Sequence, residues 1–166
     1  QTKKDLEYVF ETLKKQKKLI KKVIFLGDIK HFFSYQKLEK NWFLEILLLI
    51  GKYVKRENII AVRGNHEKIA ELADKKIKDF HIEKNIIFIH GDKEFKEISN
   101  KCIKYVVMGH LHPAISLEEG PKKEKYKCFL TGEFKKKKFI ILPSFFPTVE
   151  GTSVNIYKSD SHCIVP

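Results

Sequence analysis

Residues 23–31 read VIFLGDIKH, a short apolar run that stops at a glycine and is followed at once by polar side chains. An apolar run of this length, bounded by a turn residue, predicts a strand that is covered on both faces. The same arrangement recurs at residues 59–67 (IIAVRGNHE), 86–92 (IIFIHGD) and 105–113 (YVVMGHLHP). The chain therefore contains four predicted strands that each end directly at residues able to bind or catalyse.

The segments between and after these strands complete a predicted α/β fold. Apolar side chains three and four positions apart predict amphipathic helices at residues 3–21, 36–56 and 66–77. After Pro113 the sequence reads as strands joined by polar turns, at residues 114–118, 126–134, 138–142 and 153–158. We therefore expect a β-α-β-α-β front half, a mostly antiparallel back half, and two sheets.

The composition is typical of one globular domain and excludes several other classes of protein. The chain has 166 residues, 43% of them hydrophobic, so we expect a single domain over residues 1–166. The longest apolar run, Ile46 to Ile50, is far shorter than the ~20 residues that span a bilayer. Three cysteines without a CxxC spacing exclude a disulfide framework and a thiolate zinc finger. With no secretory signal visible, we expect a cytoplasmic protein without a membrane partner.

The charge of the chain is unusually positive and has two explanations. Lysine and arginine total 33 against 21 acidic residues, which gives a net charge of +12. Such a charge predicts a polyanionic partner, with DNA or RNA first. However, only Arg56 and Arg63 are arginines, and a lysine-rich composition is also typical of hyperthermophile proteins. Both interpretations stay open at this point.

The residues that follow the four strands form a candidate metal site. Because ligand sites of open α/β sheets lie at the carboxyl ends of the strands, we expect these side chains to meet at one edge. They are Asp28, Asn65, His66, His90, His110 and His112. Imidazoles mixed with a carboxylate and an amide oxygen suit Mn, Fe, Zn, Co or Ni. Two such ions about 3.5–4 Å apart clamp the oxygens of a phosphoryl group. A single histidine after a strand is usually an ordinary surface or core group. The prediction of a metal site therefore depends on the recurrence of such residues after all four strands.

The series GD (27–28), GNHE (64–67), HG (90–91) and GHLH (109–112) resembles the calcineurin-like metallophosphoesterases. In that family the motifs run DxH, GD, GNH(D/E), H and GHxH, so four of the five are present in order. The resemblance implies an α/β/β/α sandwich of two sheets. The extended forms GDIKH and GHLHP, with the late LPSF and the segment at Gly151, resemble the ICC-like branch. That branch is linked to Lhr-type helicases, which implies a helicase or repair partner.

The resemblance also implies two bound divalent metal ions and a role for each ligand. Manganese is the first expectation, with iron, zinc, nickel or cobalt as alternatives. Asp28 matches the carboxylate that bridges the two ions and so takes part in catalysis. Asn65, His90 and His110 match the ligands of the second metal, and His112 matches a ligand of the first.

Further residues are implied at the reacting centre and around it. His66 matches the catalytic histidine that stabilises or protonates the leaving oxygen, and Glu67 would orient it. Lys30, His31 and Arg63 lie at the rim and are candidates for holding the phosphate of a phosphate-ester substrate. Asp92, two residues beyond His90, is expected to be a turn residue.

The implied activity is hydrolysis of phosphodiester bonds, in nucleic acid or nucleotides, by a hydroxide that bridges the two metal ions. Two alternatives stay open. One is a phosphomonoesterase or small nucleotide hydrolase on the same site. The other is a non-catalytic scaffold on the same fold, a role that the retromer scaffold subunit of this superfamily shows to exist.

The first family motif, DxH, is absent from its usual place before the first helix. The chain begins with Gln and the predicted helix starts at residue 3, so the first strand of the fold is expected to be missing from this sequence. Three explanations compete. Upstream residues of a longer protein carry the motif, the motif has been lost, or Asp160 and His162 of the late triplet DSH supply it.

Overall fold

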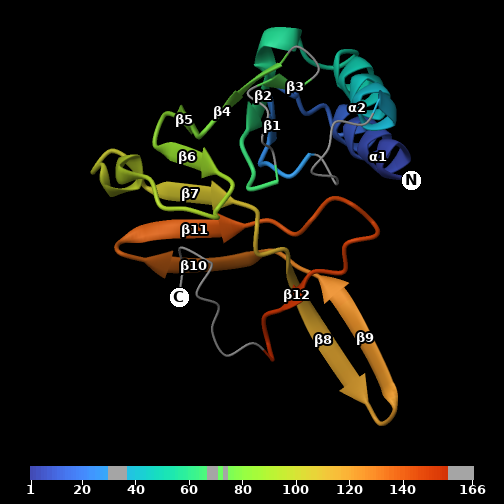
Figure 1. Cartoon of the computed structure of the whole chain (residues 1–166), viewed down its shortest axis with the longest axis vertical. Helices are drawn as coiled ribbons and strands as arrows, with labels where there is room; N and C mark the ends of the chain where they lie inside the picture. The colour runs from blue at the N-terminus through green and yellow to red at the C-terminus, as the bar shows by residue number, and fades with distance from the viewer. Residues whose placement is uncertain (30–36, 67–70, 73–74, 157–166) are drawn as a thin grey trace.

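The structure is a computed structural model that describes residues 1–29, 37–66, 71–72 and 75–156. These residues form two α-helices that lie together at one end of the molecule and three β-sheets that extend away from them (Figure 1). The predicted α/β class is therefore confirmed, since the fold is mixed α/β with several sheets and few helices.

The first sheet lies beside both helices. Its strand order is β1-β2-β4-β3, in which β1, β2 and β4 are parallel and β3 is antiparallel to β4. The bounds are β1 (Val23–Phe25), β2 (Ile59–Val62), β3 (Glu71–Leu72), β4 (Lys75–Lys78), α1 (Thr2–Lys15) and α2 (Lys37–Ile50). Phe10 of α1 and Ile50 of α2 pack with Ile59 in one buried cluster. Burial of these apolar side chains holds the helices on the sheet.

Both helices are shorter than the apolar pattern predicts. The first ends at Lys15, and Lys17 adopts a left-handed φ of 56°. The second ends at Ile50 and is followed by a turn and the 3-10 helix η1 (Arg56–Asn58). The apolar spacing continues beyond each helix end because Ile20 and Val54, which lie in non-helical backbone, pack against the same buried cluster. No helix of the described residues is long and apolar enough to cross a bilayer.

The helix predicted at residues 66–77 is wrong. His66 lies in a turn, and the described residues beyond it form β3 and β4. Strand β4 pairs in parallel with β2, so that Ala61 stands opposite Ile77, and Ile77 is 5% exposed. Pairing with β2 satisfies backbone groups and buries an apolar side chain, which outweighs a short helical pattern.

The second sheet carries the other predicted strands of the front half. Its order is β10-β11-β7-β6-β5, with β11, β7 and β6 parallel and the two outer strands antiparallel. The bounds are β5 (His81–Glu83), β6 (Ile86–Ile89), β7 (Tyr105–Met108), β10 (Leu130–Phe134) and β11 (Lys137–Ile141). Every second residue of β6 and β7 is fully buried, and Ile98 of the 3-10 helix η2 (Lys96–Ser99) packs against that face.

The third sheet projects from the rest of the molecule as a long hairpin (Figure 1). Its order is β12-β8-β9, with bounds β8 (Pro113–Glu119), β9 (Lys122–Lys127) and β12 (Thr152–Ser153). The single strand predicted at 126–134 is two strands, because β9 ends at Lys127 and β10 starts at Leu130. The predicted strand at 153–158 is limited to β12, and residues 157–158 lie outside the described residues. Strand β5 was not predicted.

Candidate metal centre

The candidate site lies where strand ends of two different sheets meet. Asp28 follows β1 of the first sheet, whereas His90 and His110 follow β6 and β7 of the second. His90 Nδ1 lies 2.7 Å from the carbonyl oxygen of Leu26, which fixes Nδ1 as the donor and joins the two sheets. The predicted meeting of strand ends is therefore correct, but the strands are not all neighbours in one sheet.

Gly27 allows this close approach. Its φ is 90°, and a Cβ atom built there would lie 2.6 Å from both the Cα atom of Gly64 and Nδ1 of His90. Real Cβ atoms do not approach other atoms so closely, so a side chain at this position would push the strand ends apart. The glycine before Asp28 is thus required by the site's geometry.

Four atoms that can act as metal ligands converge at the centre of the site. Because Nδ1 of His90 donates to Leu26, its Nε2 atom presents a lone pair to the interior. This Nε2 lies 3.0 Å from Oδ1 of Asn65, 3.1 Å from Nδ1 of His110 and 3.3 Å from Oδ2 of Asp28. His90 is only 2% exposed, so water does not screen these atoms from one another.

These distances fit a bound cation. Atoms held at about 2.1 Å from one ion lie about 3.0 Å apart in octahedral and about 3.4 Å apart in tetrahedral arrangement. The separations from His90 Nε2 fall in or next to this range. Ligand atoms of Asp28, His90 and His110 also lie within 4.8 Å of one another. The donor set of two imidazoles, one carboxylate and one amide oxygen therefore fits a borderline divalent metal.

The pKa values of Asp28 and His90 are shifted in opposite directions by their contact with each other. Burial by itself raises the pKa of Asp28, but the hydrogen bond and charge of His90 and the amide of His66 outweigh it, and the net pKa is lowered. Burial by itself lowers the pKa of His90, but the hydrogen bond and charge of Asp28 raise it above its usual value. Asp28 and His90 therefore each stabilise the charged form of the other.

Three residues of the site adopt left-handed backbone conformations. The φ angles are 51° at Asp28, 60° at His110 and 47° at His112. Residues other than glycine rarely adopt such angles, and they cluster where function requires an otherwise unfavourable geometry. The turn at each strand end therefore aims its side chain at the site at some cost in stability.

His112 lies next to this group and is held by a late segment of the chain. The amide of Thr152 donates to the carbonyl oxygen of His112 at 2.8 Å, and β12 pairs with β8 just beyond it. A Cβ atom at Gly151, whose φ is 90°, would lie 2.3 Å from that carbonyl oxygen. Burial and the positive charges of His90 and His110 lower the pKa of His112, although the charge of Asp28 raises it. This support by Gly151 and Thr152 was not predicted, because the two segments are far apart in sequence.

The other predicted residues have mixed placements. The backbone amide of His66 donates to Oδ1 of Asp28 at 3.2 Å, and the charge of His66 helps lower the pKa of Asp28. Nε of Arg63 pairs with Asp79 at 3.0 Å. Asp92 lies in a bend, and its charge helps raise the pKa of His90. The predicted residues that lie outside the described part of the chain are Lys30, His31, Glu67, Asp160 and His162.

Comparison with known families agrees with this site. A family model described as the calcineurin-like phosphoesterase superfamily domain matches residues 4–139. The chain belongs to this superfamily. As a calcineurin-like phosphoesterase it is in a family that usually binds divalent metals, and the four converging atoms supply a place for one.

Two solved structures are similar to this calcineurin-like phosphoesterase. They are a single mutant and a double mutant of Vps29 from Entamoeba histolytica, at 13% and 14% sequence identity. Each has a TM-score of 0.44 and covers 80% of this chain. The matched region spans 64% of each of those chains, so this chain covers less than two thirds of them. No curated protein matches the chain significantly.

Proposed function

We propose that this chain is a metal-dependent phosphoesterase that hydrolyses phosphodiester bonds. The observation that carries the proposal is the convergence of Asn65, His110 and Asp28 on Nε2 of His90. A buried set of potential ligand atoms at these distances suits a cation, and the family supplies the reaction class. When bound, divalent cations polarise a phosphoryl oxygen and lower the pKa of water.

The protein's own residues would hold the substrate and move the proton. His66 stands one residue beyond Asn65, and its amide is tied to Asp28, which places it at the edge of the metal site. From there its imidazole donates a proton to the leaving oxygen. The strained turns at Asp28 and His110 keep the ligands in position before any substrate binds, so the bound state needs little rearrangement.

The proposal also includes the first metal of the pair, held by Asp28 and His112, beside the ion at His90. Asp28 has two carboxylate oxygens, one directed at His90 and one accepting from the His66 amide. His112 lies close enough for its pKa to be affected by the charge of Asp28. The remaining ligands would come from a DxH motif, either upstream of this sequence or at Asp160 and His162.

The preferred substrate in this proposal is a diester of nucleic acid or a nucleotide. The net charge of +12 supports it, because a polyanionic substrate is attracted to a basic surface. A phosphomonoesterase on the same site is the alternative. A non-catalytic scaffold is the second candidate, because the described residues bring together the ligands of one ion only.

The test is hydrolysis of a chromogenic phosphodiester and the matching phosphomonoester, with Mn²⁺, Ni²⁺, Zn²⁺ and Mg²⁺ in turn. We expect the diester to be cleaved faster, with activity lost in His110→Asn. Asparagine tolerates the left-handed backbone at this position, so this variant removes the imidazole with little strain. Faster cleavage of the monoester would support the alternative enzyme. No hydrolysis with any ion, in a chain that binds metal, would support the scaffold.

A further inference from the structure

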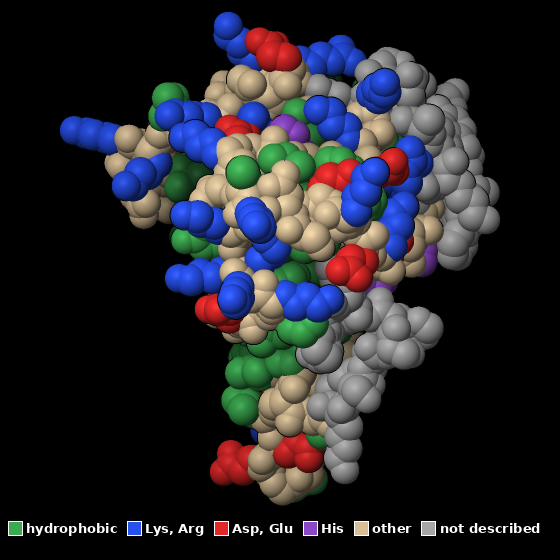
Figure 2. Space-filling model, turned by 90° about the vertical axis from the view of Figure 1, so that its left-hand side faces the viewer, with side chains coloured by type: hydrophobic (Ala, Val, Ile, Leu, Met, Phe, Trp, Pro, Cys, Tyr) green, Lys and Arg blue, Asp and Glu red, His purple; other side chains and the backbone are tan. Residues whose placement is uncertain are grey.

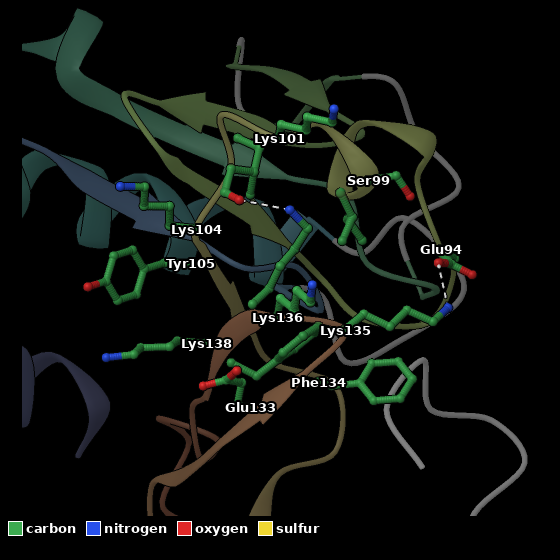
Figure 3. A pocket seen from close by; sticks show the side chains of 14 residues that line it. Glu94, Ser99, Lys101, Lys104, Tyr105, Glu133, Phe134, Lys135, Lys136 and Lys138 are labelled. Atoms are coloured by element: carbon green, nitrogen blue, oxygen red, sulfur yellow. Dashed lines mark hydrogen bonds and ion pairs between the residues drawn. The ribbon is translucent and has the colours of Figure 1, made fainter.

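A second candidate site lies at the opposite end of the sheet from the metal centre. A cavity of about 700 Å³ opens between the η2 segment and the turn that joins β10 to β11 (Figure 3). Tyr105 lines it at the start of β7, whereas His110 of the metal centre follows the end of the same strand. Four strand residues span about 13 Å, so one phosphate cannot contact both sites.

The cavity combines an apolar floor with a basic rim. Ile98, Ile103 and Phe139, all buried, form part of the floor. The rim carries six lysines and two glutamates, namely Lys101, Lys104, Lys135, Lys136, Lys137, Lys138, Glu94 and Glu133. Figure 2 shows lysine and arginine side chains spread over much of the face on this side of the molecule. An apolar cavity with a positive rim fits a ligand that has both ring systems and negative charges.

Among the contacts between described residues, two of these lysines are bound by the protein. Lys137 donates to the carbonyl oxygens of Asn100 and Ile103 at 2.9 and 2.8 Å, and Lys135 pairs with Glu94 at 3.8 Å. Within the described part of the chain, the ammonium groups at the other four rim positions make no ion pair: Lys101, Lys104, Lys136 and Lys138. Their mutual repulsion favours binding of an anion.

Lysines elsewhere on the surface are of both kinds, since Lys4, Lys15 and Lys18 also make no ion pair with the described residues. On α1 and on the β8–β9 hairpin, Lys3 pairs with Glu45, Lys122 with Glu124, and Lys123 with Glu118. A lysine-rich composition adopted for stability predicts such paired charges at many positions. The rim is therefore distinguished by the placement of Tyr105 between Lys104 and Lys138, and not by the lack of ion pairs.

An aromatic side chain lies among the unpaired lysines. Tyr105 stands opposite Lys138 in the β7–β11 pairing, and the Lys138 amide donates to the Lys104 carbonyl oxygen at 2.9 Å. In Figure 3 the side chains of Lys104, Tyr105 and Lys138 extend in the same direction, with the ring between the two ammonium groups. Proteins that bind single strands combine these two features, because bases stack on the ring and phosphates bind the cations.

We propose that the rim of this cavity binds single-stranded nucleic acid on the face that carries Tyr105 and Lys138, which is opposite the apolar floor at Phe139. One base stacks on Tyr105, and the adjoining phosphates bind Lys104, Lys136 and Lys138. The site is separate from the metal centre and does not depend on hydrolysis. It would hold a strand to the protein whether or not the metal centre cleaves it.

The test is fluorescence anisotropy of a labelled oligothymidylate of about twelve nucleotides, a length suited to one single-strand site. The measurements are made in EDTA, so that failure of the proposed hydrolysis cannot affect the result. The rim variant is Lys104→Gln/Lys136→Gln/Lys138→Gln. The matched control is Lys4→Gln/Lys15→Gln/Lys18→Gln, which removes the same charge from exposed positions in and just after α1.

We expect the rim variant to bind at least about tenfold more weakly at 50 mM salt, with a salt slope smaller by about 2. The control should stay within about twofold of the unchanged chain. Tyr105→Leu should weaken binding by about fivefold or more, because stacking is lost. Equal losses in rim variant and control, or no binding by the unchanged chain, would overturn the proposal. So would displacement by thymidine triphosphate as effective as that by unlabelled strand at equal phosphate concentration.

Discussion

Nδ1 of His110 lies 3.1 Å from Nε2 of His90, and the two imidazole planes meet at 70°. The edge of one ring therefore faces the edge of the other, with Asn65 and Asp28 completing the group around the same nitrogen. Two arrangements suit this distance: Nδ1 of His110 donates a hydrogen bond to Nε2 of His90, or both nitrogens bind one cation. The following predictions test the second arrangement, in which the two rings share a cation.

His66→Ala should lose phosphodiester hydrolysis but keep its metal. A proton donor to the leaving oxygen contributes about 10²–10⁴-fold to the rate, so kcat should fall by that factor. Metal content should stay unchanged, because the contact with Asp28 comes from the backbone amide. His81→Gln, on β5 opposite Phe88 and outside the proposed ligand set, is the matched histidine control. An unchanged rate in His66→Ala would refute the assigned role.

Gly27→Ala should destabilise the protein strongly and abolish metal binding. The left-handed φ and the contacts at 2.6 Å with Gly64 and His90 together cost roughly 2–5 kcal/mol. Gly120→Ala is the control, because Gly120 has a φ of 57° but open space around it, and it should cost only about 1–2 kcal/mol. Urea unfolding measures both. Similar losses in the two variants would show that close packing at Gly27 is not important.

Gly151→Ala should weaken the metal centre without touching any of its ligands. A side chain there displaces the segment that binds the His112 carbonyl oxygen and so moves the His112 turn. We expect a lower affinity for the ion at His112 and a lower kcat, with the ion at His90 and His110 retained. Titration calorimetry with Mn²⁺ measures the two affinities separately. Unchanged affinity for both ions would exclude a role for this segment in the site.

His81 should make the protein less stable at acid pH. Burial lowers the pKa of His81 below its ordinary value of 6.5, and Lys22 and Lys78 lower it further, although Glu83 raises it. The unfolded chain therefore binds the proton more readily than the folded one. This contribution to stability is complete above about pH 6.5 and is lost as the pH falls through the lower folded value.

The measurement for His81 is urea unfolding at about pH 8 and about pH 5, in EDTA, for the unchanged chain and His81→Gln. EDTA keeps metal binding from adding its own pH dependence. The unchanged chain should lose more stability between the two pH values than the variant. An identical loss in both proteins would mean that His81 does not titrate as described.

The sequence predicted the parts of the fold in which local pattern and tertiary packing agree. Four short apolar runs form β1, β2, β6 and β7, and the polar residues after them meet as expected. Both the apolar run that marks a buried strand and the glycine and polar residues that mark its end can be read from a few consecutive residues. The prediction of Asp28, Asn65, His90 and His110 as neighbours followed from these alone.

The parts that failed depend on partners distant in sequence. Lys75–Lys78 is a strand because β2 lies beside it, and no local pattern of 12 residues shows that partner. Strand β9 is rich in lysine and reads as a turn, yet it pairs along its whole length with β8. Likewise, Gly151 supports His112 only because β12 returns to the start of β8. The rim lysines became a candidate site only once η2 was seen beside the β10–β11 turn.

The central claim is that Asp28, Asn65, His90 and His110 hold a divalent metal ion. Elemental mass spectrometry after Mn²⁺ loading and desalting tests it most directly, with Asp28→Asn as the near-isosteric variant and His81→Gln as the control. The account predicts at least about one ion per chain in the unchanged protein and the control, and a large loss in Asp28→Asn. Near two ions would show that the second position is filled as well. Negligible metal in the unchanged chain, or equal metal in Asp28→Asn, would contradict the claim.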